Sequence, residues 1–98
     1  MTNNQLIYKF MNGDVKSGQL KVNNLRIEPG NKENSYILYN YNTPILYVED
    51  IDNPTFLLNE TKYSLTTSKI QNTIKLCDNT KYKINCIDEN TLMTLINS

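Results

Sequence analysis

Short runs rich in Ile, Leu, Tyr and Val fill the middle of the chain, and this pattern restricts the fold more than any other feature. Four such runs are Leu25–Glu28, Ser35–Tyr41, Ile45–Val48 and Thr55–Asn59, and the residues between them are rich in Asn, Gly and Pro. β-Branched and aromatic side chains suit a pleated, half-buried surface, and short connections join antiparallel neighbours. The pattern therefore predicts an antiparallel β meander.

The N-terminal residues predict a hairpin that precedes this meander. Gln5–Phe10 is a short apolar-rich run, which we interpret as the first strand. Asn12-Gly13-Asp14 follows it, and Asn-Gly tolerates the positive φ angles of a type I′ turn. Val15–Val22 can then return as the second strand.

After Ser64 the spacing of apolar residues changes from strand-like to helical. Ile70, Ile74 and Cys77 are separated by four and three residues, which places them on one face of a helix. Thr67 or Ser68 is a suitable N-cap, because its hydroxyl can accept a hydrogen bond from the first turn. We therefore expect a helix over Ser68–Cys77.

The C-terminal residues predict one more strand and one more helix. Lys81–Ile87 alternates between apolar and polar residues and is typical of a strand. Asp88 can cap a helix over Glu89–Ile96, and Glu89 suits the positive end of its dipole. The whole chain is then an α+β fold, with a meander of about five or six strands followed by two short helices.

Length and composition indicate one small domain. At 98 residues the chain is near the lower limit for comfortable independent folding, so a homodimer would add stability. No apolar run approaches the roughly 20 residues that span a bilayer, and the first residues do not resemble a signal peptide. We therefore expect no membrane association and a location in the cytoplasm.

The chain lacks the residues of common catalytic sites. It has no His, so an imidazole base and a His metal ligand are both excluded. Cys77 and Cys86 are too few for a zinc site, and we expect two free, buried thiols. Phosphate-binding loops, dinucleotide fingerprints and nucleophile elbows are absent from the sequence. We expect a binding protein without a cofactor, and not an enzyme.

The charges are strongly separated along the chain, although the formal net charge is zero. Residues 35–60 contain four acidic residues and no Lys or Arg, whereas residues 61–83, the basic segment, contain five Lys and one acidic residue, Asp78. Clustered lysines attract phosphate groups irrespective of net charge. The basic segment is therefore the part of the chain that we expect to attract phosphate groups.

Hydroxyl and ammonium groups lie together at the start of the helix expected in the basic segment. Five hydroxyl residues occur between Thr61 and Ser68, beside Lys62 and Lys69. Helix N-termini, hydroxyls and ammonium groups all suit a phosphate, so we expect contact with a nucleic-acid backbone, RNA more than duplex DNA. The alternative is an ordinary N-cap beside solvated lysines. The candidate residues are Lys62, Tyr63, Thr67, Ser68, Lys69, Asn72, Lys75, Lys81 and Lys83.

Two other groups of residues have both a functional and a structural interpretation. Tyr39, Tyr41 and Tyr63 can stack on bases, but tyrosines on strands more often belong to the core or its rim. Glu49, Asp50 and Asp52 form an acidic loop that does not match a calcium-binding pattern. This loop is either solvated or binds a basic patch on a partner protein.

Two blocks of the sequence resemble a known family. They are Y-N-Y-N-T-P-I at residues 39–45 and L-N-E-T-K-Y-S-L-T-T-S-K-I-Q at residues 58–71. They are similar to a small uncharacterised domain of phage and plasmid proteins, with the pattern Y-N-T-P-I and then N-x-T-K-Y-S-x-T-T-S-K-H-Q. Ile70 replaces the His of that pattern. The resemblance covers about a third of the chain and implies an origin in a mobile element.

These observations lead to two hypotheses about function. The first is a phage accessory protein, of the counter-defence (anti-CRISPR-like) kind, that binds RNA through its basic segment. The second is an inhibitor that binds a host factor, such as a defence protein complex, through the acidic loop or an exposed β-edge. A homodimeric structural or regulatory protein is a third, weaker interpretation.

Overall fold

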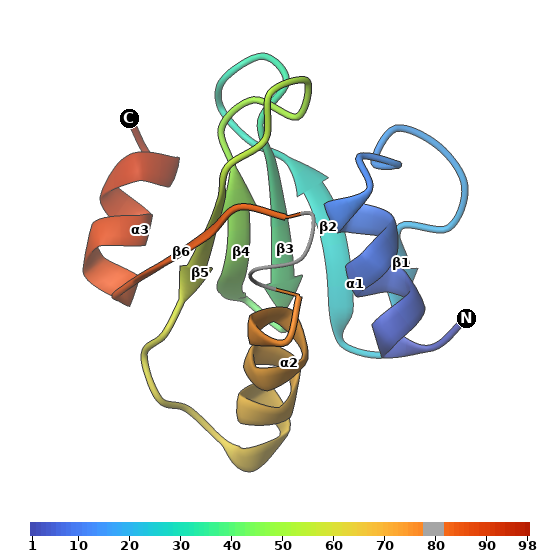
Figure 1. Cartoon of the computed structure of the whole chain (residues 1–98), viewed down its shortest axis with the longest axis vertical. Coiled ribbons are helices and arrows are strands. Elements are labelled where there is room, and N and C mark those ends of the chain that lie inside the picture. The colour runs from blue at the N-terminus through green and yellow to red at the C-terminus, as the bar shows by residue number, and fades with distance from the viewer. Residues whose placement is uncertain (78–81) are drawn as a thin grey trace.

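A six-stranded sheet with helices on both faces forms the structure, a computed structural model that describes residues 1–77 and 82–98 (Figure 1). The elements in chain order are α1 (Asn3–Met11), β1 (Lys21–Val22), β2 (Leu25–Pro29), β3 (Tyr36–Asn40), β4 (Thr43–Val48), β5 (Phe56–Asn59), α2 (Leu65–Lys75), β6 (Ile84–Ile87) and α3 (Glu89–Ile96). The α+β class and the largely antiparallel sheet are as predicted.

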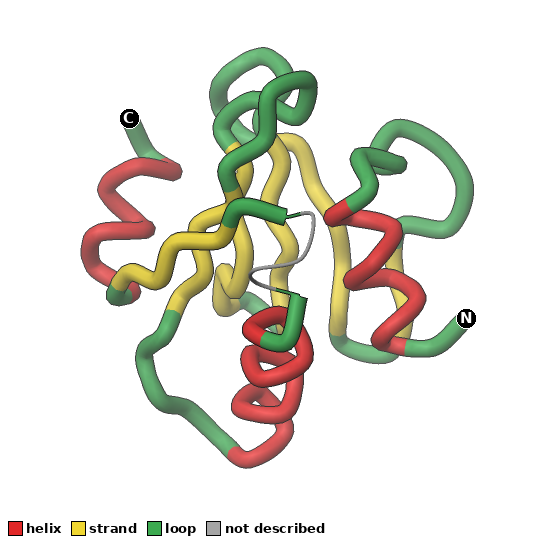
Figure 2. Tube along the Cα trace, in the orientation of Figure 1, coloured by secondary structure: helices red, strands yellow, loops and turns green. Residues whose placement is uncertain are grey.

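The strands lie in the sheet in the order in which they occur in the chain. Neighbours from β1 to β5 pair antiparallel, whereas β5 and β6 pair parallel (Figure 2). A parallel pair cannot be joined by a tight turn, and here α2 provides the crossover. The sheet therefore departs from a simple meander at its last strand.

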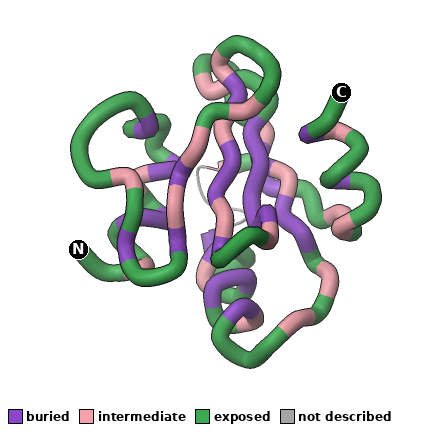
Figure 3. Tube along the Cα trace, turned by 180° about the vertical axis from the view of Figure 1, so that it is seen from behind, coloured by how far each residue is buried: buried purple, intermediate pink, exposed green. Residues whose placement is uncertain are grey.

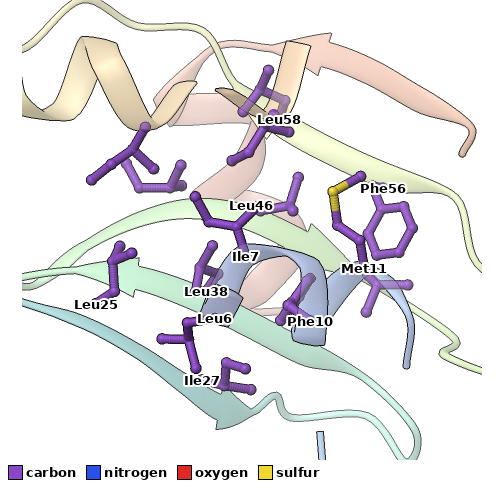
Figure 4. Packing of buried hydrophobic residues seen from close by; sticks show 14 of the residues in the cluster. Leu6, Ile7, Phe10, Met11, Leu25, Ile27, Leu38, Leu46, Phe56 and Leu58 are labelled. Carbon is purple, nitrogen blue, oxygen red and sulfur yellow. The ribbon is translucent and has the colours of Figure 1, made fainter. Parts of the chain in front are cut away.

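Two helices cover one face of the sheet and the third covers part of the other. α1 and α2 pack beside each other over the main core, which includes Leu6, Ile7, Phe10, Leu46 and Phe56 (Figure 4). α3 packs on the opposite face over β4 and β5. There a second, smaller cluster joins Ile37 and Tyr47 of the sheet to Leu92 and Ile96 of α3. The fold thus has three layers.

The prediction of a strand over Gln5–Phe10 was wrong, because these residues belong to α1. Thr2 and Gln5 form a capping box: the Thr2 hydroxyl accepts from the Gln5 N–H, and the Gln5 side chain accepts from the Thr2 N–H at 2.7 Å. The buried residues Leu6, Ile7, Phe10 and Met11 have helical spacing. A Thr-x-x-Gln sequence was the signal that favoured the helix.

The expected hairpin turn at Asn12-Gly13 instead ends α1. Gly13 has a φ of +81°, and its N–H donates to the Phe10 carbonyl at 3.1 Å. Residues 15–20 form a loop held by Lys9, whose ammonium contacts the Asp14 carboxylate at 2.6 Å and the Ser17 carbonyl at 2.9 Å. Only Lys21–Val22 of the expected second strand lies in the sheet.

The predicted central strands and the last helix are confirmed. β2, β3, β4 and β5 overlap the four predicted runs, and α3 has the predicted bounds, with Asp88 as its N-cap. The Asp88 carboxylate accepts from the Thr91 N–H at 2.7 Å, and hydrogen bonds from the Thr91 side chain and from this N–H lower the pKa of Asp88. Local sequence signals and packing agree in these elements.

The second helix begins earlier than predicted. α2 starts at Leu65 with Ser64 as its N-cap, because the side chain of Thr67 is buried and the Ser64 hydroxyl accepts from the Thr67 N–H. The strand expected from Lys81 is shorter and begins at Ile84, and Lys81 itself lies outside the described residues. Cys77 is buried as predicted, whereas Cys86 is exposed on β6, contrary to prediction.

Candidate nucleic-acid interface

The loop between β5 and α2 is held by side-chain amides. Gln71 of α2 donates through Nε2 to the carbonyl oxygens of Asn59 and Thr61, at 2.6 and 2.9 Å. Asn59 donates through Nδ2 to the Pro44 carbonyl and to the Tyr63 hydroxyl, both at 2.9 Å. Asn59 and Gln71 are both buried. Asn59 and Gln71, both within residues 58–71, therefore have a structural role.

Three of the hydroxyl residues expected to contact phosphate also have internal partners. Thr67 is 6% exposed, and its hydroxyl accepts from Asn40 Nδ2 at 2.9 Å. The Ser64 hydroxyl caps α2, and the Thr61 hydroxyl accepts from the Glu89 N–H at 2.9 Å. All three hydroxyls accept hydrogen bonds within the protein, but only that of Thr67 lies in the interior.

Two of the candidate contact residues are less accessible than the others. Thr67 is buried, and Tyr63 is half-buried with its hydroxyl held by Asn59. Burial raises the pKa of Tyr63 above its ordinary value. Thr67 therefore does not present its hydroxyl to a phosphate, whereas Ser64 and Thr66 remain exposed.

The lysines of the basic segment remain at the surface. The side chains of Lys62, Lys69, Lys75 and Lys83 are all exposed, and we call them the lysine surface. Asn72 is exposed and Ser68 is half-buried, both on α2. Lys81, which was also predicted to contact nucleic acid, lies outside the described residues.

The lysine surface takes no part in the ion pairs of the residues that the structure describes. These pairs are Lys9–Asp14, Arg26–Glu28 and Lys32–Glu49. Exposed ammonium groups of this kind attract external anions.

Within the lysine surface, the charges are spread along α2 instead of meeting at one point. Lys69 and Lys75 are six residues apart on α2, which corresponds to about 9 Å along the helix axis. Lys69 borders a shallow groove of about 120 Å³ between α2 and the first residues of α1, Asn3 and Asn4. Lys62 precedes α2 and Lys83 precedes β6. Such spacing suits an extended polyanion better than a single phosphate ion.

The acidic loop borders a hollow on the surface. A cavity of about 370 Å³ is lined by Glu49, Asp50, Asn53, Thr55 and Leu57, and we call it the acidic hollow. Lys32 contacts the Glu49 carboxylate at 2.6 Å, and Asp50 accepts from the Asp52 N–H at 3.0 Å. Asp52 is exposed but does not line the hollow. Leu57, from the next strand, was not indicated by the sequence.

No protein-family model matches this chain, and neither the curated proteins nor the solved structures include a significant match. Among residues 1–77 and 82–98, no group of three or more Cys, Asp or Glu side chains is placed to hold a metal ion. In the same residues, no helix combines the length and apolar character needed to cross a membrane. Similarity to known proteins therefore indicates no function, and the surfaces described above are the basis of the proposal.

Proposed function

We propose that this chain is a phage-encoded accessory protein that acts by binding RNA, and not by catalysis. The observation that carries the proposal is the lysine surface: four exposed ammonium groups without an ion-pair partner in the described part of the chain. Lysines bind phosphate as point charges and carry little sequence information. The protein should therefore recognise backbone and shape, and bases only weakly.

RNA is favoured over duplex DNA by the nature of the cations. Specific reading of duplex DNA commonly uses arginine, which binds guanine through two hydrogen bonds. Arg26 is the only arginine, and it contacts Glu28 and the Tyr41 carbonyl. Protein recognition of RNA more often relies on shape, backbone and unpaired bases.

The counter-defence role is the biological part of the proposal. It is supported by the resemblance of residues 39–45 and 58–71 to a domain of phage and plasmid proteins. Small proteins of mobile elements often act on host defence by binding, so we place the activity in the host cytoplasm. Binding of a guide or other RNA of a defence complex would fit the lysine surface.

A salt titration of the wild-type protein tests RNA binding. If four lysines each contact a phosphate, log K for a single-stranded RNA should fall with log [salt] with a slope of about −3. Fluorescence anisotropy of a labelled oligonucleotide measures this slope. Protein that purifies without nucleic acid and shows no salt-dependent binding of RNA would reject the proposal.

The acidic hollow supports a second candidate, an inhibitor that binds a basic segment of a host protein. Asp50 offers a carboxylate to a Lys or Arg side chain and Leu57 can contact its aliphatic stem, while Glu49 is already paired with Lys32. We expect Asp50→Lys to abolish inhibition of such a host system in a cell-based assay, with Lys69→Glu tolerated as the matched control. Loss with Lys69→Glu alone would instead favour RNA binding.

A further inference from the structure

One part of the sheet has no helix over it. Within the described residues, α1 and α2 cover one face, and α3 on the other face packs over β4 and β5. Seen from behind, β1 and β2 lie on the side of the sheet away from α3, with no helix in front of them (Figure 3). This uncovered area carries a row of side chains from residues outside the basic segment.

Cross-strand pairing places cationic and aromatic side chains in that row. Lys21 of β1 is opposite Arg26 of β2, and Arg26 is opposite Tyr39 of β3. Directly opposite residues share a face of the sheet. Leu25 and Ile27, their neighbours on β2, point to the main core, so the row faces away from α1 and α2. We call Lys21, Arg26, Tyr39 and the adjacent Tyr41 the sheet platform.

The guanidinium group of Arg26 is held in a fixed position on this platform. Its central carbon lies 4.4 Å from the centroid of the Tyr39 ring. The same group donates to the Glu28 carboxylate and to the Tyr41 carbonyl. A guanidinium plane fixed over an aromatic ring is one of the surfaces on which nucleic-acid bases stack.

Tyr41 presents an aromatic ring to solvent at a strained position. Its side chain is 62% exposed, and its φ is +56°, which is unfavourable for a bulky residue. Its backbone is held on both sides, because its N–H donates to the Asn24 carbonyl at 2.8 Å and its carbonyl accepts from Arg26. Asn would fit this backbone better, so stability does not account for an exposed Tyr here.

The turn between β3 and β4 is joined to α2, which carries part of the lysine surface. Asn40, immediately before Tyr41, donates to the Thr67 hydroxyl at 2.9 Å, and both residues are buried. Lys69 lies two residues further along α2. The platform and α2 are thus linked through the interior at this turn.

We infer that the sheet platform binds the unpaired bases of single-stranded RNA. This inference rests on the proposed function and adds the strand class and a second contact site. A base stacks on the exposed Tyr41 ring and on the Arg26 guanidinium, while Lys21, which has no ion pair in the described part of the chain, contacts a phosphate. Lys21 and the exposed Tyr41 ring favour a nucleic acid over a protein partner, although Glu28 offsets the charge of Arg26.

Three forms of the full chain and two RNA molecules test the inference. We compare wild type, Tyr41→Asn and Tyr41→Phe for binding to a single-stranded oligonucleotide and to a duplex of equal length. Tyr41→Asn should weaken binding of the single strand about 5-fold or more, because one stacked base is lost. Tyr41→Phe keeps a stacking ring and should bind like wild type, and affinity for the duplex should change in neither variant.

Stability and fluorescence complete the experiment. Tyr41→Asn should not lower the melting temperature, since Asn tolerates the left-handed backbone, so lost binding cannot be attributed to unfolding. The chain has no Trp, and quenching of Tyr fluorescence by the single strand should decrease in this variant. Unchanged affinity of Tyr41→Asn, with salt-dependent RNA binding intact, would overturn the platform but keep the lysine surface. Absence of RNA binding by wild type would overturn both.

Discussion

Replacing Gln71 with Leu is expected to lower the free energy of unfolding by about 2–4 kcal/mol. Gln71 donates to the carbonyl oxygens of Asn59 and Thr61 from a position that is 6% exposed. Leu has a similar volume but no donor, so both carbonyls lose their side-chain partner. Each unsatisfied buried acceptor costs about 1–3 kcal/mol. Urea denaturation followed by circular dichroism measures the change.

The neighbouring Asn72 provides a matched control for this substitution. Asn72 lies on the same helix, is exposed and has no part in the amide network. Asn72→Leu should change the free energy of unfolding by less than about 0.5 kcal/mol. Similar values for the two variants would mean that the amide network does not hold the loop between β5 and α2.

Reversing the charge of Lys69 and Lys75 together should weaken binding of single-stranded RNA about 30-fold at physiological salt. The figure corresponds to two exposed phosphate contacts of about 1 kcal/mol each. The slope of log K against log [salt] should also shrink, from about −3 to about −1.5. Anisotropy titrations at several salt concentrations measure both quantities.

A variant outside the basic segment separates this effect from net charge. Lys16→Glu changes the charge by as much as Lys69→Glu alone, in the loop that follows α1, and Lys16 has no ion pair in the described part of the chain. Lys16→Glu should keep most of the salt slope, because Lys16 does not lie on α2 or next to β6. Equal losses in Lys16→Glu and Lys69→Glu would show that RNA is attracted by total charge only, and not by the lysine surface.

The elements that could be predicted from the sequence are those in which local signals and packing agree. β2 to β5 and α3 carry their own turn or cap residues, such as Asp88. The run at residues 5–10 was ambiguous, because six apolar-rich residues suit a strand or a helix, and the capping box of Thr2 and Gln5 decided it. The parallel direction of β6 depends on where α2 packs, which no local pattern specifies.

The candidate site was predictable in its charges but not in its hydroxyls. Exposure of the four described lysines follows from their polarity, whereas the partners of Thr61 and Thr67 are distant in sequence. Thr61 meets Glu89, 28 residues away, and Thr67 meets Asn40, 27 residues away. Only the fold brings these groups together, and it places Thr67 in the interior while Thr61 stays half-buried.

The crossover between β5 and β6 also sets an order for folding. The strand pairs from β1 to β5 join neighbours in sequence, and such local contacts form early. β6 can pair with β5 only after α2 has crossed the sheet, and α3 then closes over Ile37 and Tyr47. A folding intermediate without β6 would therefore expose β5 as an open edge, which is a template for pairing with another chain.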